Sequence, residues 1–398
     1  MLTLEKIYQA AFVLKQVARK TDLIHAQKLS GDNEIYLKTE NLQVTGSFKL
    51  RGAYYKISQL TEEQKAAGIL ACSAGNHAQG VALASSRMGI KSVICMPAGA
   101  PISKVEATRA LGAEVCLVPG AYDDAYAHAR ELEKETHATF IHPFDDEDVI
   151  AGQGTIGLEI LDQLENADAV VVPVGGGGLL AGVAYAIKQL RPDIKVYGVE
   201  AEGAASMFQS HQVGQVVSLD KAATFADGIA VRRPGELTFS LIEQYVDGIV
   251  TVTEDEIAAA ILALIEKQKL IAEGAGAVSV AAAMFGKLPI HGKRVVCLVS
   301  GGNIDVNILS RVITRGLVKS GRNATLEIVL QDKPGQLESV CRIIAKCGAN
   351  VVTVHHERSG GNVPIAGCYI RVEMETRDFA QIEEIRAALI AEGLNLVS

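Results

Sequence analysis

The sequence has no tryptophan, and aromatic residues make up only 5% of its 398 positions. It contains neither a CxxC pair nor an HExxH motif, and only one pair of adjacent histidines, His355 and His356, occurs among the nine. A zinc knuckle, a redox dithiol and a histidine-based metal centre are therefore not predicted, and no metal ligand is assigned. The seven cysteines are an odd number, and Cys95, Cys116 and Cys297 lie in apolar runs, which favours reduced thiols in a cytoplasmic protein.

Excess positive charge is absent as well. Lys and Arg total 38 against 46 Asp and Glu, so the net charge is -8 and the chain repels nucleic-acid backbones. The N-terminus carries charges throughout and lacks the apolar core of a signal peptide. The longest uncharged run, residues 169–187, is interrupted by Pro173 and four glycines. It predicts a strand, a loop and a helix, and no membrane span.

Apolar residues are plentiful, at 48%, and between about residues 34 and 316 they form short runs separated by amphipathic segments. Near-continuous apolar strands that alternate with helices indicate an α/β protein with parallel sheets covered on both faces. Capping-box spacing at Thr61–Gln64 and at Thr253–Glu256 marks two helix starts. The predicted strands are 68–72, 91–97, 113–119, 169–174, 195–200, 248–253 and 294–300.

The pattern changes near residue 319. A short polar stretch, residues 319–324, predicts a linker, and residues 325–398 then read strand, helix, strand, strand, helix, strand. This βαββαβ order is that of the ferredoxin-like fold. No catalytic nucleophile or acid–base cluster is predicted in the tail, which leaves two interpretations: a regulatory binding unit, or a module for folding and oligomerisation.

Four consecutive glycines, Gly175 to Gly178, join an apolar strand to a helix. Their backbone N–H groups can surround an anion, and the helix start adds about half a positive charge, so the stretch predicts a phosphate site. The absence of GK[ST] excludes a Walker loop. Gly176, Gly178 and Ala181 fit G-x-G-x-x-A, with Glu200 ending the next strand, so a nicotinamide cofactor, another phosphorylated cofactor and a purely structural glycine turn remain open.

Lys49 lies in "TGSFKLRGA", among small and apolar residues, and is either a surface charge or a buried amine kept for chemistry. Ser73, Asn76 and His77 follow one strand and Ser300 follows another, and ligands bind at such strand ends in open α/β sheets. A phosphate loop, polar hydrogen-bonding groups, a hydroxyl and an amine are the parts that pyridoxal phosphate needs. A buried lysine joined to the cofactor aldehyde would carry no full charge, so its burial is tolerable.

Seven motifs occur together and in order: "TGSFKLRGA", "SAGNHAQG", "IAGQGTIGLEI", "VGGGGLLAG", "FADGIAV", "EGAGA" and "VSGGN". With them, nearly the full chain resembles the threonine dehydratase (threonine ammonia-lyase) family, and its tail resembles an ACT domain. The resemblance implies the pyridoxal-phosphate fold type II, similar to tryptophan synthase β, with two open parallel-sheet subdomains followed by a ferredoxin-like ACT domain. It implies a catalytic domain over 1–318, with a smaller subdomain at roughly 45–145, a linker at 319–324 and the ACT domain at 325–398.

The resemblance also assigns roles to residues. Lys49 is the expected catalytic lysine that forms a Schiff base with the cofactor. The other expected cofactor contacts are Phe48, Asn76, Gly175, Gly176, Gly177, Gly178, Leu179 and Ser300. The substrate-carboxylate loop would be Ser73, Ala74, Gly75 and His77, with Gly228 and Glu273 lining the pocket. In the tail, Asp332, Pro334 and Gly335 form the D-x-P-G turn and are the expected effector residues.

The implied reaction is the conversion of L-threonine to 2-oxobutanoate and ammonia, and of L-serine to pyruvate, under allosteric control by isoleucine or valine. Ser300 is neutral, which suits loss of a leaving group, and Ala74 stands where serine racemases have a serine base. The alternative is an L-serine dehydratase or serine-racemase-like enzyme with the tail as a plain oligomerisation module. A homo-oligomer, dimer or tetramer, is expected, and the resemblance leaves isoleucine biosynthesis and a degradative role both open.

Overall fold

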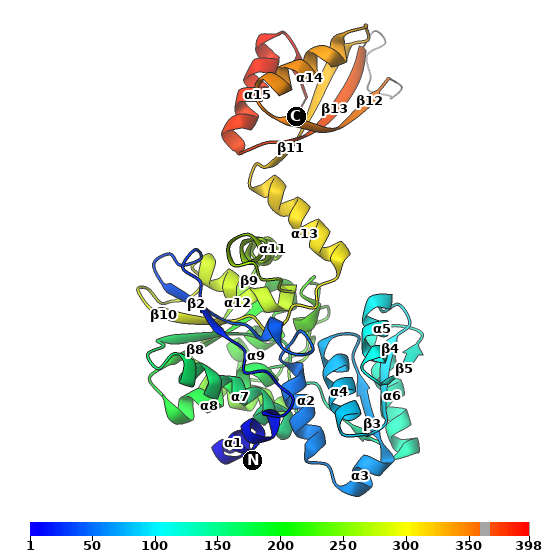
Figure 1. Ribbon diagram of the computed structural model, residues 1–398, viewed down its shortest axis with the longest axis vertical. Coiled ribbons are helices and arrows are strands. Elements are labelled where there is room, and N and C mark those ends of the chain that lie inside the picture. The colour runs from blue at the N-terminus through cyan, green and yellow to red at the C-terminus, as the bar shows by residue number, and fades with distance from the viewer. Residues whose placement is uncertain (359–366, 398) are drawn as a thin grey trace. The chain divides into compact units, whose positions relative to one another are not determined.

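The computed structural model describes residues 1–358 and 367–397 (Figure 1). Contacts within the chain divide it into two compact units, Met1–Asp305 and Val306–Ser398, which we describe separately. All seven cysteines are free, and those in the predicted strands are buried or partly buried. Among the described residues, no helix is both long enough and apolar enough to cross a bilayer.

The first unit alternates strands and helices along most of its length. In its first half the elements are α1 (Leu4–Leu14), β1 (Leu23–His25), β2 (Glu34–Lys38), α2 (Lys49–Ser58), α3 (Glu62–Ala67), β3 (Ile69–Cys72), α4 (Asn76–Arg87), β4 (Ser92–Pro97), α5 (Ile102–Ala110), β5 (Glu114–Val118), α6 (Tyr122–Thr136) and β6 (Thr139–Phe140). In its second half they are α7 (Glu147–Gln163), β7 (Ala169–Pro173), α8 (Gly178–Leu190), β8 (Lys195–Ala201), α9 (Ser206–Val213), α10 (Glu236–Tyr245), β9 (Gly248–Val252), α11 (Glu254–Ala263), α12 (Gly274–Met284) and β10 (Arg294–Leu298).

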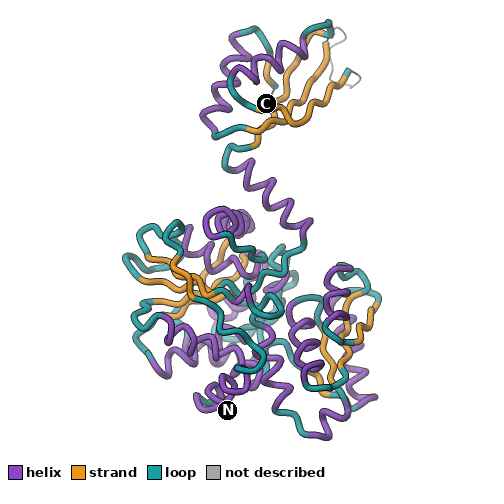
Figure 2. The backbone as a smooth tube through the Cα atoms, in the orientation of Figure 1, coloured by secondary structure: helices purple, strands orange, loops and turns teal. Residues whose placement is uncertain are grey.

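Two open sheets organise this unit, and Figure 2 shows their strands in orange with helices around them. The larger sheet has the order β1-β2-β10-β7-β8-β9, and the smaller has the order β5-β4-β3-β6. Every neighbouring pair is parallel except β1 with β2. The predicted α/β class with two parallel sheets is therefore confirmed, as are all seven predicted strands.

Helix starts and burial follow from the residues present. Thr61 and Thr253 both form the predicted capping boxes, with Gln64 and Glu256 respectively. The uncharged run 169–187 becomes β7, the glycine loop and α8, as predicted. Nine of the thirteen residues of α8 are buried, because this helix packs inside the largest apolar cluster of the unit. Its apolar character therefore reflects a buried position in a globular core.

A buried charge cluster fixes the start of α2, where Lys49 lies. Arg51 is 1% exposed and makes two-pronged contacts with both Glu40, at 2.8 Å, and Glu159, at 2.7 and 3.0 Å. Lys38 is fully buried and donates to Glu159 at 2.6 Å. Two positive and two negative groups thus neutralise one another, and their geometry sets the position of α2.

The second unit is small and has its own core. Its elements are α13 (Val306–Lys319), β11 (Asn323–Gln331), α14 (Gln336–Lys346), β12 (Asn350–Glu357), β13 (Gly367–Glu375), α15 (Phe379–Ala391) and β14 (Asn395–Leu396). After α13, the four strands form an antiparallel sheet in the order β12-β13-β11-β14. With two helices in the βαββαβ order, this is the predicted ferredoxin-like arrangement. The predicted linker, 319–324, spans the end of α13 and the start of β11.

Candidate active site

The amine of Lys49 is held inside the first unit and is not a surface charge. Lys49 is the first residue of α2, and its Nζ donates a 2.8 Å hydrogen bond to the backbone carbonyl of Pro143. The Nζ also lies 5.3 Å from the centre of the Phe48 ring. The side chain keeps some solvent access, but protein atoms surround it, and this desolvation lowers the pKa of Lys49 to about 8. Near neutral pH, a fraction of this amine is therefore unprotonated.

The glycine loop between β7 and α8 forms an anion cradle. The N–H groups of residues 175–180 donate no hydrogen bond to any described residue, although all of these residues except Gly175 are buried. Gly177 has a φ of +96°, which L side chains rarely adopt. A Cβ on Gly176 would overlap the ring of Phe144. The loop thus requires glycine, and its six free donors at the start of α8 suit a phosphate.

One dipeptide, Pro143–Phe144, connects the lysine amine to the glycine loop. The Pro143 carbonyl accepts from Lys49, and the adjacent Phe144 packs against Gly176 and Gly178. His142 holds this turn, because its Nδ1 accepts from the backbone N–H of Phe144 at 3.3 Å and of Asp145 at 2.7 Å. Burial lowers the pKa of His142, which keeps this nitrogen free to accept. The amine and the cradle therefore belong to one site.

Thr238 and Asp145 support the loop from outside. The Thr238 hydroxyl donates to the Gly176 carbonyl at 2.6 Å, and the Gly235 N–H reaches the same oxygen at 3.3 Å. The Asp145 carboxylate accepts from the Thr238 N–H at 3.1 Å. These bonds satisfy the buried carbonyl of Gly176 and fix the orientation of its peptide, while its N–H keeps no partner among the described residues. Sequence reasoning missed Thr238 and Phe144, which lie more than thirty residues away in sequence on either side of the loop and carry no motif of their own.

Asn76, Glu273 and Asn303 form a polar network at the start of α4 and α12. The Asn76 Nδ2 donates to Glu273 Oε1 at 2.5 Å, and Asn303 Nδ2 donates to Asn76 Oδ1 at 2.8 Å. Burial, and next the charge of Asp227, raise the pKa of Glu273 to about 7. A Cβ on Gly228 would lie 3.4 Å from the same Glu273 oxygen, so Gly228 adjoins this network. Asn303 was within a predicted motif but was given no role.

Ser300 lies directly behind the lysine segment. It is 2% exposed, its carbonyl accepts from the Phe48 N–H at 3.1 Å, and its hydroxyl donates weakly to the Ala275 carbonyl at 3.3 Å. The predicted residues Phe48, Lys49 and Ser300 are therefore direct neighbours. The hydroxyl makes no hydrogen bond to a charged group among the described residues, so Ser300 offers a neutral partner to a ring nitrogen.

The loop from Ser73 to His77 offers a second set of free donors. The Ser73 hydroxyl accepts from the Gly75 N–H at 3.2 Å, while the N–H groups of 74 and 76–78 have no partner among the described residues. A Cβ on Gly75 would meet nothing within 4 Å, so this side of the loop is open. Behind it, α4 approaches Lys49 closely at Gly80, where a Cβ would lie 3.0 Å from the Lys49 backbone.

The His77 side chain turns into the protein. It is 3% exposed, and its Nε2 is 2.9 Å from the Ile141 carbonyl. Burial, and next the positive charge of Lys49, lower the pKa of His77 to about 3, so the ring is neutral near pH 7. His77 therefore positions the loop through a hydrogen bond that its neutral ring donates to a backbone carbonyl, and it is not a charged acid near pH 7.

Taken together, the first unit holds the groups that pyridoxal phosphate requires. Six N–H groups without partners among the described residues, five of them from buried residues, suit its phosphate, the Lys49 amine suits its aldehyde, and Asn76 and Ser300 offer neutral polar atoms for its ring. The expected effector residues are elsewhere, in the second unit: Asp332 follows β11, and Gly335, with a φ of +87°, caps α14 after Pro334.

Comparison with known proteins gives related chains for nearly the full length. Residues 14–301 match the family model described as pyridoxal-phosphate dependent enzyme. The chain is 52% identical to the L-threonine ammonia-lyase of Thermotoga maritima, over 99% of this chain and 98% of that one. It is 44% identical to the L-threonine ammonia-lyase of Geobacter sulfurreducens with the same coverage. Among solved structures, the processed form of threonine deaminase isoform 2 from Solanum lycopersicum matches with a TM-score of 0.74 and 42% identity, over 79% of this chain and 89% of that chain.

Proposed function

Because the chain belongs to the family of pyridoxal-phosphate-dependent enzymes, we propose that it is an L-threonine ammonia-lyase, which converts L-threonine to 2-oxobutanoate and ammonia. The observation that carries the substrate assignment is its 52% identity, across 99% of its length, to the L-threonine ammonia-lyase of T. maritima. The direct contacts that link the Lys49 amine to a glycine phosphate loop support the same activity.

Pyridoxal phosphate, when bound, withdraws electrons from the α-carbon of the amino acid attached to it. The chain supplies the base: with a pKa of about 8, the Lys49 amine can accept the α-proton near neutral pH. The free N–H groups at the start of α4 hold the substrate carboxylate beside it, and the helix dipole strengthens this contact. Asn76, held in place by its hydrogen bond to Glu273, would contact the ring of the bound cofactor.

We propose that L-serine is a second substrate and that racemisation is slow. Racemisation requires a second base on the opposite face of the α-carbon, and the methyl group of Ala74 can neither accept nor donate a proton in such a role. The neutral Ser300 hydroxyl also favours rapid loss of the β-hydroxyl, since it does not hold a positive charge on the cofactor ring.

The test is release of ammonia and 2-oxoacids from a panel of amino acids by the full-length enzyme. L-Threonine should be the best substrate, followed by L-serine, and D-serine should not accumulate. The Lys49→Ala variant should yield no product, while Lys56→Ala, on the same helix, should retain activity. Equal product from Lys49→Ala, or a preference for an unrelated amino acid, would refute the assignment.

We propose that the second unit is an ACT domain that senses isoleucine or valine through Asp332, Pro334 and Gly335. Its ferredoxin-like topology supports this, and so does the match of two threonine ammonia-lyases to the whole chain, including the tail. Residues 1–318 should keep turnover but lose any response to either amino acid. A full-length enzyme that responds to neither, together with a changed assembly after truncation, would favour the plain oligomerisation role.

The remaining proposals concern the cell and the assembly. We propose a cytoplasmic enzyme, supported by the seven free cysteines, and a homo-oligomer, either a dimer or a tetramer. Light scattering of the purified enzyme at working concentration distinguishes these assemblies from a monomer.

A further inference from the structure

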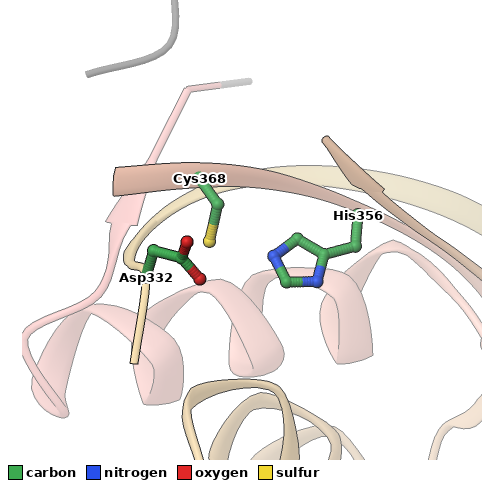
Figure 3. A group of neighbouring side chains, drawn as sticks. All are labelled: Asp332, His356 and Cys368. Atoms are coloured by element: carbon green, nitrogen blue, oxygen red, sulfur yellow. The ribbon is translucent and has the colours of Figure 1, made fainter. Parts of the chain in front are cut away.

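Three side chains able to ligate a metal ion converge at one end of the sheet in the second unit. Asp332 follows β11, His356 belongs to β12 and Cys368 belongs to β13. Their nearest ligand atoms all lie within 4.8 Å of one another. Figure 3 shows the Asp332 carboxylate beside the Cys368 sulfur, with the His356 ring turned toward both.

Strand register explains why these residues meet. Leu330 pairs with Cys368, and His356 pairs with Ile370, so each pair shares one face of the sheet. Residues two apart on a strand also share a face, which places Asp332 with Leu330 and Cys368 with Ile370. This face carries the apolar core of the unit, and the three ligating side chains lie at its margin, with Cys368 buried and the other two exposed.

We propose that Asp332, His356 and Cys368 bind one divalent cation of the zinc class. A thiolate and an imidazole select zinc or a similar transition metal over magnesium and calcium, which prefer oxygen ligands. Around a tetrahedral zinc ion, ligand atoms lie about 3.5 Å apart, so shifts of about 1 Å in the exposed Asp332 and His356 side chains complete the geometry. Three protein ligands leave the fourth position for water.

Two features of the site oppose the ion and define the competing explanation. Burial and the charge of Asp332 raise the pKa of Cys368, so the ion must displace the thiol proton on binding. Arg358 forms a 3.2 Å ion pair with Asp332. The competing explanation is that Asp332 serves only to pair with Arg358 and that the three side chains bind no metal ion. Arg358 is 64% exposed, so it can leave Asp332 without burying or stranding a charge.

The matched control is the adjacent histidine. His355 is exposed like His356, but it pairs with Arg371 on the opposite face of the sheet. Replacing either histidine by alanine removes one exposed imidazole from the same strand, so stability should change equally. Only His356→Ala should affect the ion. Cys341→Ser, in α14, serves as the control for Cys368→Ser.

The experiment measures zinc bound to the untagged, full-length holoenzyme after chelator treatment, reloading with Zn²⁺ and removal of excess ion. We expect one zinc ion per chain in the wild type and in His355→Ala. Zinc affinity should fall at least about a hundredfold in His356→Ala, since loss of an outer partner alone costs up to that much. With Co²⁺ in place of zinc, the charge-transfer absorption of a cobalt–thiolate bond should disappear in Cys368→Ser and persist in Cys341→Ser.

Three results would overturn the site. They are a wild type that retains no zinc, a His356→Ala variant that retains as much zinc as His355→Ala, and Mg²⁺ binding as tight as that of Zn²⁺. Arg358→Ala adds a further check, because it removes the competing cation and should tighten zinc binding. Since His355, His356 and Arg358 are exposed, these variants stay informative even if Cys368→Ser weakens the core of the unit.

Discussion

The Thr238 hydroxyl should control how tightly the cofactor is held, although we do not expect it to touch the cofactor. It is fully buried and donates to the Gly176 carbonyl at 2.6 Å. Without it, the Gly176 carbonyl would keep only the longer hydrogen bond from the Gly235 N–H, at 3.3 Å. Thr238→Val keeps the shape and deletes this bond, at a cost of about 1–1.4 kcal/mol. If that cost falls on the orientation of the glycine loop, cofactor affinity should drop about five- to tenfold.

A matched variant separates this effect from general destabilisation. Thr39 is also fully buried, and its hydroxyl donates to a backbone carbonyl, that of Asp22, at 2.9 Å. Thr39→Val should lower unfolding stability by a similar amount without changing cofactor affinity. Titration of the apo enzyme with pyridoxal phosphate, followed by the absorption of the bound cofactor, gives both affinities. Equal affinities for the two variants would refute the idea that Thr238 acts through the loop.

Three further predictions concern the first unit. The rate at which the apo enzyme binds pyridoxal phosphate, followed by stopped-flow absorbance, should rise with pH and level off above about 8, because only the unprotonated amine of Lys49 attacks an aldehyde. If Lys49 were solvated, the rate would keep rising up to the ordinary pKa of 10.5. Gly177→Asp should lose cofactor on dialysis, since it strains a φ of +96° and adds a negative charge to the cradle, and normal retention would contradict the phosphate assignment. Arg51→Met should lower the free energy of unfolding, measured in urea, by about 3–5 kcal/mol, because it leaves the buried Glu40 carboxylate without its partner. Arg232→Met, which breaks an exposed ion pair, should change the free energy of unfolding by no more than about 1 kcal/mol. Similar losses for both variants would show that the buried cluster has no special role.

Apolar patterning predicted the strands well, since a strand buried on both faces has little choice of residue. It missed β1, β2 and β6, which have three, five and two residues, because such short or charge-bearing segments give no period-two signal. The βαββαβ tail was predictable for a different reason: its strands alternate, and their apolar face packs against two helices.

The site was predictable only in part. The glycine run is local, and its meaning as an anion cradle follows from strand, loop and helix start alone. The environment of Lys49 is not local: the groups that desolvate its amine include Pro143, 94 residues away. For the same reason, the inward turn of the His77 ring onto Ile141 could not be read from "SAGNHAQG", because it depends on a segment after β6.

The Pro143–Phe144 peptide has a consequence for which forms of vitamin B6 this enzyme keeps. The Pro143 carbonyl accepts a hydrogen bond from the Lys49 amine, and Phe144 packs against the glycine loop, so this peptide holds the amine and the loop in a fixed relation. Pyridoxal without its phosphate can react with the amine but has no group for the loop to bind, so it should wash out readily. Two residues without reactive side chains therefore help this enzyme to retain the phosphorylated form of the coenzyme.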